Sequence, residues 1–460
     1  MKKDNLESTL QEKTISDFYQ NEAISYAAYD NSRKLCSYID GQKISQRKLL
    51  YTIRKRFSKE FQKTESIANI CASDTQYLHG AANLVGVASL MAQDFVGANN
   101  YPIFRGNSGG FGTRINPVFA AGRYTRLTLS DISGILFNKN DDANLIEQIF
   151  EGDIIEPKYF IPIFPVIFLN GSDGLSTGFS ETIYPRNPKE IIKYIKAFLA
   201  GKKSNLSLLP WFKGFKGDIR FNNETNSNEC IGVIERINTT KYLIKELPIG
   251  ISYQKYIEIL DKLVDDKVIV DYEDKCDTKT DEILFEIKTT REFTNKHNNI
   301  DSLNKVFRLV KSLSENFCFI DENNSVREFK DVFEILDSYI SIRFEFYKKR
   351  KTFILNTLKS ELEKLVSKYV FCKSIIDKKL VISNRKKDDI VNDLSKIDKI
   401  IRIDGTYDYL LKMPISQITK EEVQKLKDLI TSKKDEFNKI KATSESDMWI
   451  SDLNELEKIF

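Results

Sequence analysis

The feature that most constrains the fold is a long run near the C-terminus, from Asp331 to about Ile376, which contains neither glycine nor proline. Apolar residues recur along the run at the spacing of one helix face: Val332, Leu336, Tyr339, Ile342, Phe346, Phe353, Leu358, Leu362 and Leu365. At about 1.5 Å per residue, such a helix would be roughly 65 Å long. A helix of this length with one apolar face requires a partner.

A second amphipathic helix is predicted after Pro414. Its seam has a heptad-like spacing, given by Val423, Leu426, Ile430, Phe437 and Ile440. The two predicted helices are separated by an insert at about 377–413. This order predicts a long antiparallel coiled coil with a small knob at its tip.

The rest of the chain divides at Pro185-Arg186-Asn187-Pro188, a sequence typical of a domain junction. Residues 1–13 read as a flexible tail. Residues 14–185 are rich in aromatics and glycines and include a predicted helix over 80–95, whereas strands and helices alternate over 186–328, with strands expected at 230–234, 242–247 and 283–287. Residues 329–460 hold the coiled coil and its insert. The fold class expected is therefore α+β, with several domains.

Composition favours a globular protein with a polyanionic partner, but only weakly. Hydrophobic residues make up 41% of the 460, and the net charge is +4. The six cysteines form no Cys-x-x-Cys pair and there are only two histidines, so no metal site is expected in this chain. The N-terminus has no apolar core of a signal peptide, and no apolar run has membrane-spanning length. A cytoplasmic protein without a membrane partner is expected.

Tyr124 is the strongest candidate for chemistry, because it directly follows Arg123 and comes soon after the glycine-rich basic segment 105–114. A phenol has a pKa of about 10, so ionising it at pH 7 costs roughly 4 kcal/mol. A nucleophilic tyrosine therefore needs nearby cations or a base. Taken alone, Tyr124 is best read as a structural tyrosine of the core or surface, one of twenty.

Other segments carry weaker signals for anion binding. Glycines in 105–114 let backbone N–H groups approach phosphate, although the chain has no G-x-x-x-x-G-K-[ST] sequence and so no P-loop ATP site. Lys43, Arg47 and Lys48 lie at the start of a basic helix, and His79 precedes another helix start. Each segment also has an ordinary reading, as a surface loop, a solvated charged face or a structural histidine.

Leu175 lies in the glycine-punctuated turn 170–178. Exposed, it could act as a wedge between base pairs. Buried, it would be the core residue of a β-turn.

In their order along the chain, these segments resemble the breakage-reunion subunit of type IIA DNA topoisomerases. The resemblance covers about Thr14 to Phe460 and rests on Asp-Gly-x-Lys-x-x-Gln-Arg-[RK] at 40–48, Tyr-x-His-Gly at 77–80, Gly-Phe-Gly-Thr-Arg at 110–114, Ala-Ala-Gly-Arg-Tyr at 120–124 and the segments 156–165 and 170–178. Residues 409–414 and 447–453 look like the eukaryotic and viral branch. The extent of the chain is most similar to the medium subunit of T-even-type phage topoisomerases, and a gyrase A subunit is a poorer match.

The resemblance implies a role for each matching residue. Tyr124 would attack a backbone phosphate and become linked to a DNA 5′ end, with Arg123, Arg47 and His79 around that phosphate. Leu175, where the family usually has isoleucine, would wedge the bent duplex. Further DNA contacts are expected from Lys43, Gln46, Lys48, Asn83, Thr113 and Arg114.

The resemblance also implies an architecture and partners. It predicts a winged-helix DNA-cleavage domain (14–185), an α/β tower domain (186–328) and a coiled coil whose insert forms a C-gate that makes a homodimer on double-stranded DNA. Mg²⁺ and ATP would both be bound by one or more separate ATPase/Toprim subunits, because the Toprim pattern of Glu with a later Asp-x-Asp is absent. A phage-encoded chain would act in the host cytoplasm.

Two readings from other classes remain: a DNA-binding architectural protein that does not cleave, and a coiled-coil dimerisation protein. In addition, Ala81, Ala82 and Asn83 stand where bacterial relatives often carry a serine and an acidic residue that help to bind quinolones. Weak quinolone sensitivity is therefore expected.

Overall fold

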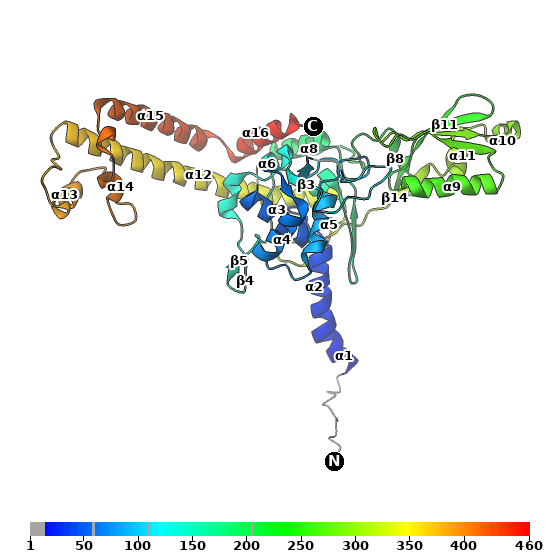
Figure 1. Cartoon of the computed structure of the whole chain (residues 1–460), viewed down its shortest axis with the longest axis horizontal. Helices are drawn as coiled ribbons and strands as arrows, with labels where there is room; N and C mark the ends of the chain where they lie inside the picture. Colours follow the sequence, from blue (N-terminus) through cyan, green and yellow to red (C-terminus); the bar gives the residue numbers. More distant parts are fainter. Residues whose placement is uncertain (1–13, 58–59, 108–109, 204–205) are drawn as a thin grey trace, which may run out of the picture. The chain divides into compact units, whose positions relative to one another are not determined.

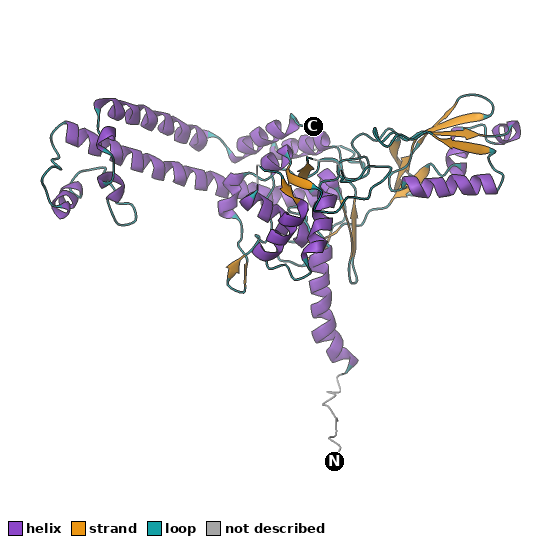
Figure 2. Cartoon of the chain, viewed as in Figure 1, coloured by secondary structure: helices purple, strands orange, loops and turns teal. Residues whose placement is uncertain are grey.

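The computed structural model describes residues 14–57, 60–107, 110–203 and 206–460, and the predicted tail 1–13 lies outside them. The described chain forms two compact units. One takes in the residues up to Asn138, Leu145–Arg343 and Asp452–Phe460; the other takes in Lys139–Asn144 and Phe344–Ser451. Helices and strands are mixed throughout the first unit, and helices dominate the second (Figures 1 and 2). None of the helices in the described part of the chain could cross a membrane.

The first unit begins with helices and a small antiparallel sheet of strand order β1-β3-β2. The helices are α1 (Ile15–Phe18), the π-helical turn η1 (Tyr19–Ala23), α2 (Ile24–Lys34), α3 (Ile44–Arg56), α4 (Thr64–Asp74), α5 (Ala81–Met91) and α6 (Asp131–Leu136), and the strands are β1 (Gln62–Lys63), β2 (Phe104–Gly106) and β3 (Arg126–Leu129). The helix predicted over 80–95 was too long, since α5 ends at Met91. Gly80, with φ of 79°, is its N-cap.

Short hairpins and helices complete the segment up to residue 199. They are β4 (Ile149–Phe150) with β5 (Asp153–Ile154), α7 (Ile167–Asn170), β6 (Ser172–Leu175) with β7 (Ser180–Ile183), and α8 (Pro188–Leu199). Asn187 caps α8 by accepting a hydrogen bond from the Lys189 N–H at 3.0 Å, and Pro188 starts the helix where its missing N–H costs nothing.

Residues 218–313 form two antiparallel sheets and three helices. The sheets have the strand orders β14-β9-β8 and β10-β11-β13-β12. Their elements are β8 (Asp218–Asn222), β9 (Ser227–Ile231), β10 (Val233–Arg236), β11 (Lys241–Glu246), α9 (Tyr253–Asp265), β12 (Asp271–Asp274), β13 (Phe285–Lys288), α10 (Arg291–Lys296), α11 (Ile300–Val306) and β14 (Val310–Leu313).

The single strand predicted at 230–234 was wrong, because Gly232 divides it between the two sheets. The Gly232 N–H donates to the Leu309 carbonyl at 2.8 Å, and a Cβ at this position would lie 2.5 Å from the Glu246 carbonyl oxygen. Only glycine allows the chain to pass from one sheet to the other here.

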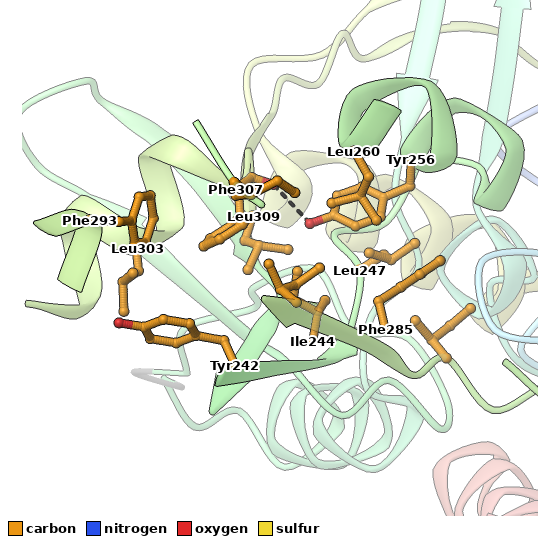
Figure 3. Packing of buried hydrophobic residues seen from close by; sticks show 13 residues of the cluster. Tyr242, Ile244, Leu247, Tyr256, Leu260, Phe285, Phe293, Leu303, Phe307 and Leu309 are labelled. Atoms are coloured by element: carbon orange, nitrogen blue, oxygen red, sulfur yellow. Dashed lines mark hydrogen bonds between the residues drawn. The ribbon is translucent and has the colours of Figure 1, made fainter. Parts of the chain in front are cut away.

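An aromatic core fills the space between the four-stranded sheet and its helices (Figure 3). Tyr242 and Phe285 from the sheet, Tyr256 from α9 and Phe307 after α11 are all fully buried. The Tyr256 hydroxyl donates to the Phe307 carbonyl at 3.0 Å, which satisfies the one polar group that this ring buries.

The long helix expected near the C-terminus is confirmed: after the hairpin β15 (Cys318–Ile320) with β16 (Val326–Glu328), α12 runs over Val332–Ile376. The remaining elements are α13 (Lys387–Leu394), α14 (Asp408–Leu411), the 3₁₀ turn η3 (Ile415–Gln417), α15 (Lys420–Ala442) and α16 (Glu445–Glu457), with the earlier 3₁₀ turn η2 (Lys139–Asn144) also in the second unit. The second predicted helix starts at Lys420 rather than just after Pro414, because Thr419 caps it by accepting from the Glu422 N–H at 3.2 Å.

Contacts in the second unit run antiparallel. Glu361 of α12 pairs with Lys433 at 3.1 Å, and Lys351, earlier on α12, pairs with Glu445 at 3.4 Å. Earlier residues of α12 thus contact later residues of the C-terminal segment. The end of α12 packs with the insert in a separate core made by Phe371, Cys372, Leu380, Ile390, Leu394, Ile400, Tyr407 and Leu410.

Candidate functional site

Tyr124 lies on a short loop that the backbone fixes on both sides. The Glu65 N–H donates to the Gly122 carbonyl at 3.2 Å, and the Thr64 N–H donates to the Thr125 carbonyl at 3.1 Å. Both donors belong to the first turn of α4, whose N–H groups have no partner inside the helix. Thr125 is fully buried, whereas Tyr124 is 70% exposed. The loop therefore presents its phenol to solvent from a fixed backbone.

Arg123 contributes a positive charge directly beside this phenol. Its guanidinium carbon lies 4.9 Å from the centre of the Tyr124 ring, within the range of a cation–π contact. Both residues are exposed, so an incoming anion can reach the charge and the hydroxyl together.

Arg47 and His79 line a separate feature, a cavity of about 290 Å³ whose wall also includes Tyr29, Arg33 and Lys158. Arg47 is buried. It is held by Asp40, with Nε 2.7 Å from Oδ2 and a second guanidinium nitrogen 3.1 Å from Oδ1. Burial alone would lower the pKa of Arg47, but the Asp40 carboxylate more than offsets this and the pKa is raised. Arg47 is thus a permanently charged group in the cavity wall, already paired with an acid.

Lys48 does not present a free ammonium group to DNA, and the prediction for it needs correction. Its side chain is buried, and Nζ donates to Glu156 at 2.8 Å and to the Thr75 carbonyl at 2.6 Å. Burial raises the pKa of Glu156, and the Lys48 charge opposes that rise. A buried pair of this kind positions α3 against the segment around residue 156.

Arg114 and Gln46 also have internal partners. The Arg114 guanidinium pairs with the buried Glu246 carboxylate and donates to the Leu247 carbonyl at 3.2 Å. The Gln46 side chain accepts from the Lys43 N–H at 2.8 Å and so caps the start of α3. Both residues thus have structural contacts, and a direct DNA contact by either residue stays a prediction.

Four other residues that were predicted to contact DNA are exposed or partly exposed. Leu175 is 78% exposed at the end of β6, so the buried alternative is excluded. Lys43 is half-buried and reaches the same hairpin, since its Nζ donates to the Asp173 carbonyl at 2.6 Å. Asn83 is exposed in the first turn of α5, and the half-buried Thr113 accepts from the Asn116 N–H at 3.1 Å. Of the glycine-rich segment, residues 108–109 lie outside the described chain.

His79 has neighbours that the sequence did not suggest. Its Nε2 lies 2.6 Å from the Tyr29 hydroxyl, and the Tyr77 ring stands edge-on at 5.5 Å. Although the residue is exposed, the flanking groups desolvate the ring and, with a smaller effect from the Arg33 charge, lower the pKa of His79. The sequence carried no signal for the Tyr29 contact, because Tyr29 lies fifty residues before His79.

The described residues offer no cluster of side chains suited to hold Mg²⁺. Among the residues that the structure describes, no group of three or more His, Cys, Asp or Glu side chains gathers as metal ligands would. No step of the chemistry is therefore assigned to a metal held by these residues.

Comparison with known proteins places this arrangement in a family. The family model for the DNA gyrase/topoisomerase IV A subunit matches residues 33–454. The chain belongs to this family. The family's solved structures include a Plasmodium falciparum topoisomerase II DNA-binding, cleavage and re-ligation domain, which superimposes with a TM-score of 0.87 at 32% identity and covers 96% of this chain and 64% of that one.

Two similar curated proteins are eukaryotic topoisomerases. A mitochondrial DNA topoisomerase 2 from Dictyostelium discoideum is 32% identical over 466 residues, which is 98% of this chain and 36% of the relative. DNA topoisomerase 2 from Plasmodium falciparum is 32% identical over 489 residues, covering 97% and 34%. The chain thus spans about a third of the length of these relatives.

Proposed function

We propose that this chain is the DNA breakage-reunion subunit of a type IIA topoisomerase. The observation that carries the proposal is the exposed Tyr124, held on a backbone-anchored loop with the Arg123 guanidinium 4.9 Å from its ring. Family membership and the likeness to a cleavage and re-ligation domain support the same reading.

The proposed reaction is a reversible transfer of a phosphodiester. The Tyr124 oxygen attacks a backbone phosphorus and the phenol loses its proton. The bond between the phosphorus and the 3′ oxygen breaks, and the 3′ oxygen takes up a proton. A 5′-phosphotyrosine ester and a free 3′ hydroxyl result, and the reverse attack reseals the strand. Two copies of the chain cut the two strands, and a second duplex passes through. Because the ester keeps the bond energy, resealing needs no external source.

Charge stabilisation falls to Arg123 and to His79 and Arg47 in the cavity wall. Cations and hydrogen-bond donors fixed in advance around a phosphate favour the extra negative charge of its transition state. Arg47 is already held by Asp40, so it contributes a fixed charge without reorganising. Lys43, Asn83 and Thr113 would contact the backbone of the DNA, and Leu175 would enter the base stack.

The architecture proposed for this function has three parts. Residues 14–185 form a winged-helix domain, supported by α3, α4 and α5 beside the sheet β1-β3-β2. Residues 186–328 form the tower, supported by two antiparallel sheets that Gly232 joins between β9 and β10. Residues 329–460 form the coiled coil, whose insert at 377–413 has its own core and makes the homodimer.

Mg²⁺ and ATP are assigned to a separate ATPase/Toprim partner, as in a phage-type medium subunit. The chain has no P-loop sequence and its described residues form no metal-ligand cluster, so neither group is assigned to a residue named here.

The decisive experiment traps the covalent intermediate. The chain is combined with its partner subunit, Mg²⁺ and supercoiled plasmid, and quenched with detergent. Protein attached to linear DNA is expected. Tyr124→Phe should abolish the adduct and leave DNA binding intact, because only the hydroxyl is lost. Tyr369→Phe in α12 serves as the control and should cleave normally.

A wild-type chain that binds DNA without ever forming the adduct would contradict the proposal. That result would instead support the architectural DNA-binding alternative.

A further inference from the structure

The imidazole of His79 is held from two sides within the first unit. The Tyr29 hydroxyl lies 2.6 Å from Nε2, and the Tyr77 ring stands edge-on with an interplanar angle of 71°. All three residues line the 290 Å³ cavity that also contains Arg47. No partner for the other ring nitrogen, Nδ1, occurs among the described residues.

Tyr29 is itself fixed by the helix that carries it. Arg33, one turn later on α2, places its guanidinium carbon 5.4 Å from the Tyr29 ring centre. Asp30, which follows Tyr29 in the chain, is buried and accepts hydrogen bonds from the Thr177 N–H at 3.1 Å and the Thr177 hydroxyl at 2.8 Å. Adjacent Asn31 accepts from the Ser176 hydroxyl at 2.6 Å. These bonds attach α2 to the turn after Leu175, so Tyr29 approaches His79 from a fixed helix.

We propose that Tyr29 is a positioning residue for His79: its hydroxyl donates to Nε2 and thereby selects the tautomer that carries its proton on Nδ1, aimed at a phosphate oxygen. The presence of a DNA phosphate beside His79 rests on the proposed function. The tautomer of His79 can be measured whether or not the protein cleaves DNA. A hydrogen bond at one imidazole nitrogen fixes both the tautomer and the ring orientation.

The neutral imidazole is the form that this arrangement requires. A protonated ring would carry N–H groups on both nitrogens and could not accept from the Tyr29 hydroxyl. The desolvation of the ring and the Arg33 charge both lower the pKa of His79, which favours the neutral form at pH 7. The other charged or titratable groups in the cavity wall are Arg47, Lys48, Tyr77, Glu156, Lys158, Tyr159 and Asp321.

The test uses the fact that the chain has only two histidines. The full chain is labelled with ¹⁵N in its imidazoles, and His79→Gln assigns the resonances. In the wild-type chain the two His79 nitrogens should show the separated shifts of a single tautomer. Tyr29→Phe, which keeps the ring and removes the hydroxyl, should make the two shifts converge. His297, whose Nδ1 lies 2.6 Å from the Ser302 hydroxyl, should not move.

The second measurement is cleavage by the chain assembled with its partner. Tyr29→Phe should slow formation of the covalent adduct about fivefold to tenfold, the effect of one hydrogen bond, with DNA affinity unchanged. Tyr26→Phe, on the same helix and 62% exposed, is the matched control and should change neither measurement.

The outcomes separate the two proposals. Unchanged ¹⁵N shifts in Tyr29→Phe overturn the inference, whatever happens to cleavage. If the shifts converge in Tyr29→Phe but the variant cleaves at the wild-type rate, then positioning of His79 by Tyr29 does not contribute to cleavage. If the wild-type enzyme forms no adduct at all, the proposed function fails, whereas the tautomer result still stands.

Discussion

At the scale of single residues, the candidate site divides into a part that the sequence predicts and a part that it cannot. Tyr124 and Arg123 are adjacent, so their association follows from the chain itself, and the structure adds that the phenol is exposed. Arg47 and Lys48 looked like one basic surface. Both are buried and paired with acids, because a run of charges does not reveal which residues face inward.

The contact between Tyr29 and His79 shows the same limit more strongly. Fifty residues separate the two side chains, and only the folded chain brings them within 2.6 Å. The sequence marked His79 as a candidate but gave no means to find its partner.

A titration of His79 tests the electrostatics of this cavity. Arg33→Ala removes a positive charge that disfavours the protonated imidazole, so the pKa of His79 should rise toward its usual value. The change is followed by the ¹⁵N shifts of the ring as a function of pH. The pKa of His297, which is lowered by its own desolvation and by Lys296, should stay constant. A His79 pKa that does not rise would show that the Arg33 charge is screened by solvent.

At the scale of elements, predictions were accurate where one physical signal dominated. The absence of glycine and proline over 331–376 predicted α12, whose bounds are Val332–Ile376. The strand at 230–234 failed because apolar residues on both sides of Gly232 read as one strand, although they belong to two sheets. The end of a helix, such as that of α5 at Met91, depends on local capping. The spacing of apolar residues does not predict where such capping occurs.

The loop of Tyr124 offers a prediction at this scale. A Cβ on Gly122 would lie 2.7 Å from Val85 Cγ1 in α5 and 3.2 Å from the Glu65 nitrogen in α4. Gly122→Ala should therefore displace the loop and lower the rate of adduct formation at least tenfold, while DNA binding is kept. The rate is measured by the same detergent trap.

Gly134→Ala is the matched control, because a Cβ there meets nothing within 4 Å and α6 gains a better helix former. Equal cleavage by the two variants would mean that the loop position does not matter for the chemistry.

At the scale of the whole molecule, each compact unit has its own core, and the proposed homodimer depends on the second. Val381 is 55% exposed within the insert at 377–413. If the insert forms the dimer contact, Val381→Glu should weaken self-association about tenfold, since a charge would enter an apolar interface. Light scattering at a series of concentrations gives the dissociation constant.

Leu429→Glu in α15, at a residue that is 45% exposed, introduces the same charge outside the insert and should leave the dimer intact. A dimer weakened only by Leu429→Glu would move the proposed contact from the insert to the helix pair.

The crossing at Gly232 also decides where the chain tolerates engineering. Gly232 alone separates β9 from β10. Its N–H is hydrogen-bonded and the space that a Cβ would need is filled, so the backbone cannot shift here. A split site, a circular permutation or a grafted epitope placed there would pull two ladders out of register at once. The exposed loop after α8 is better suited to a probe, attached at Lys202 rather than at Gly201, whose φ of 68° favours glycine.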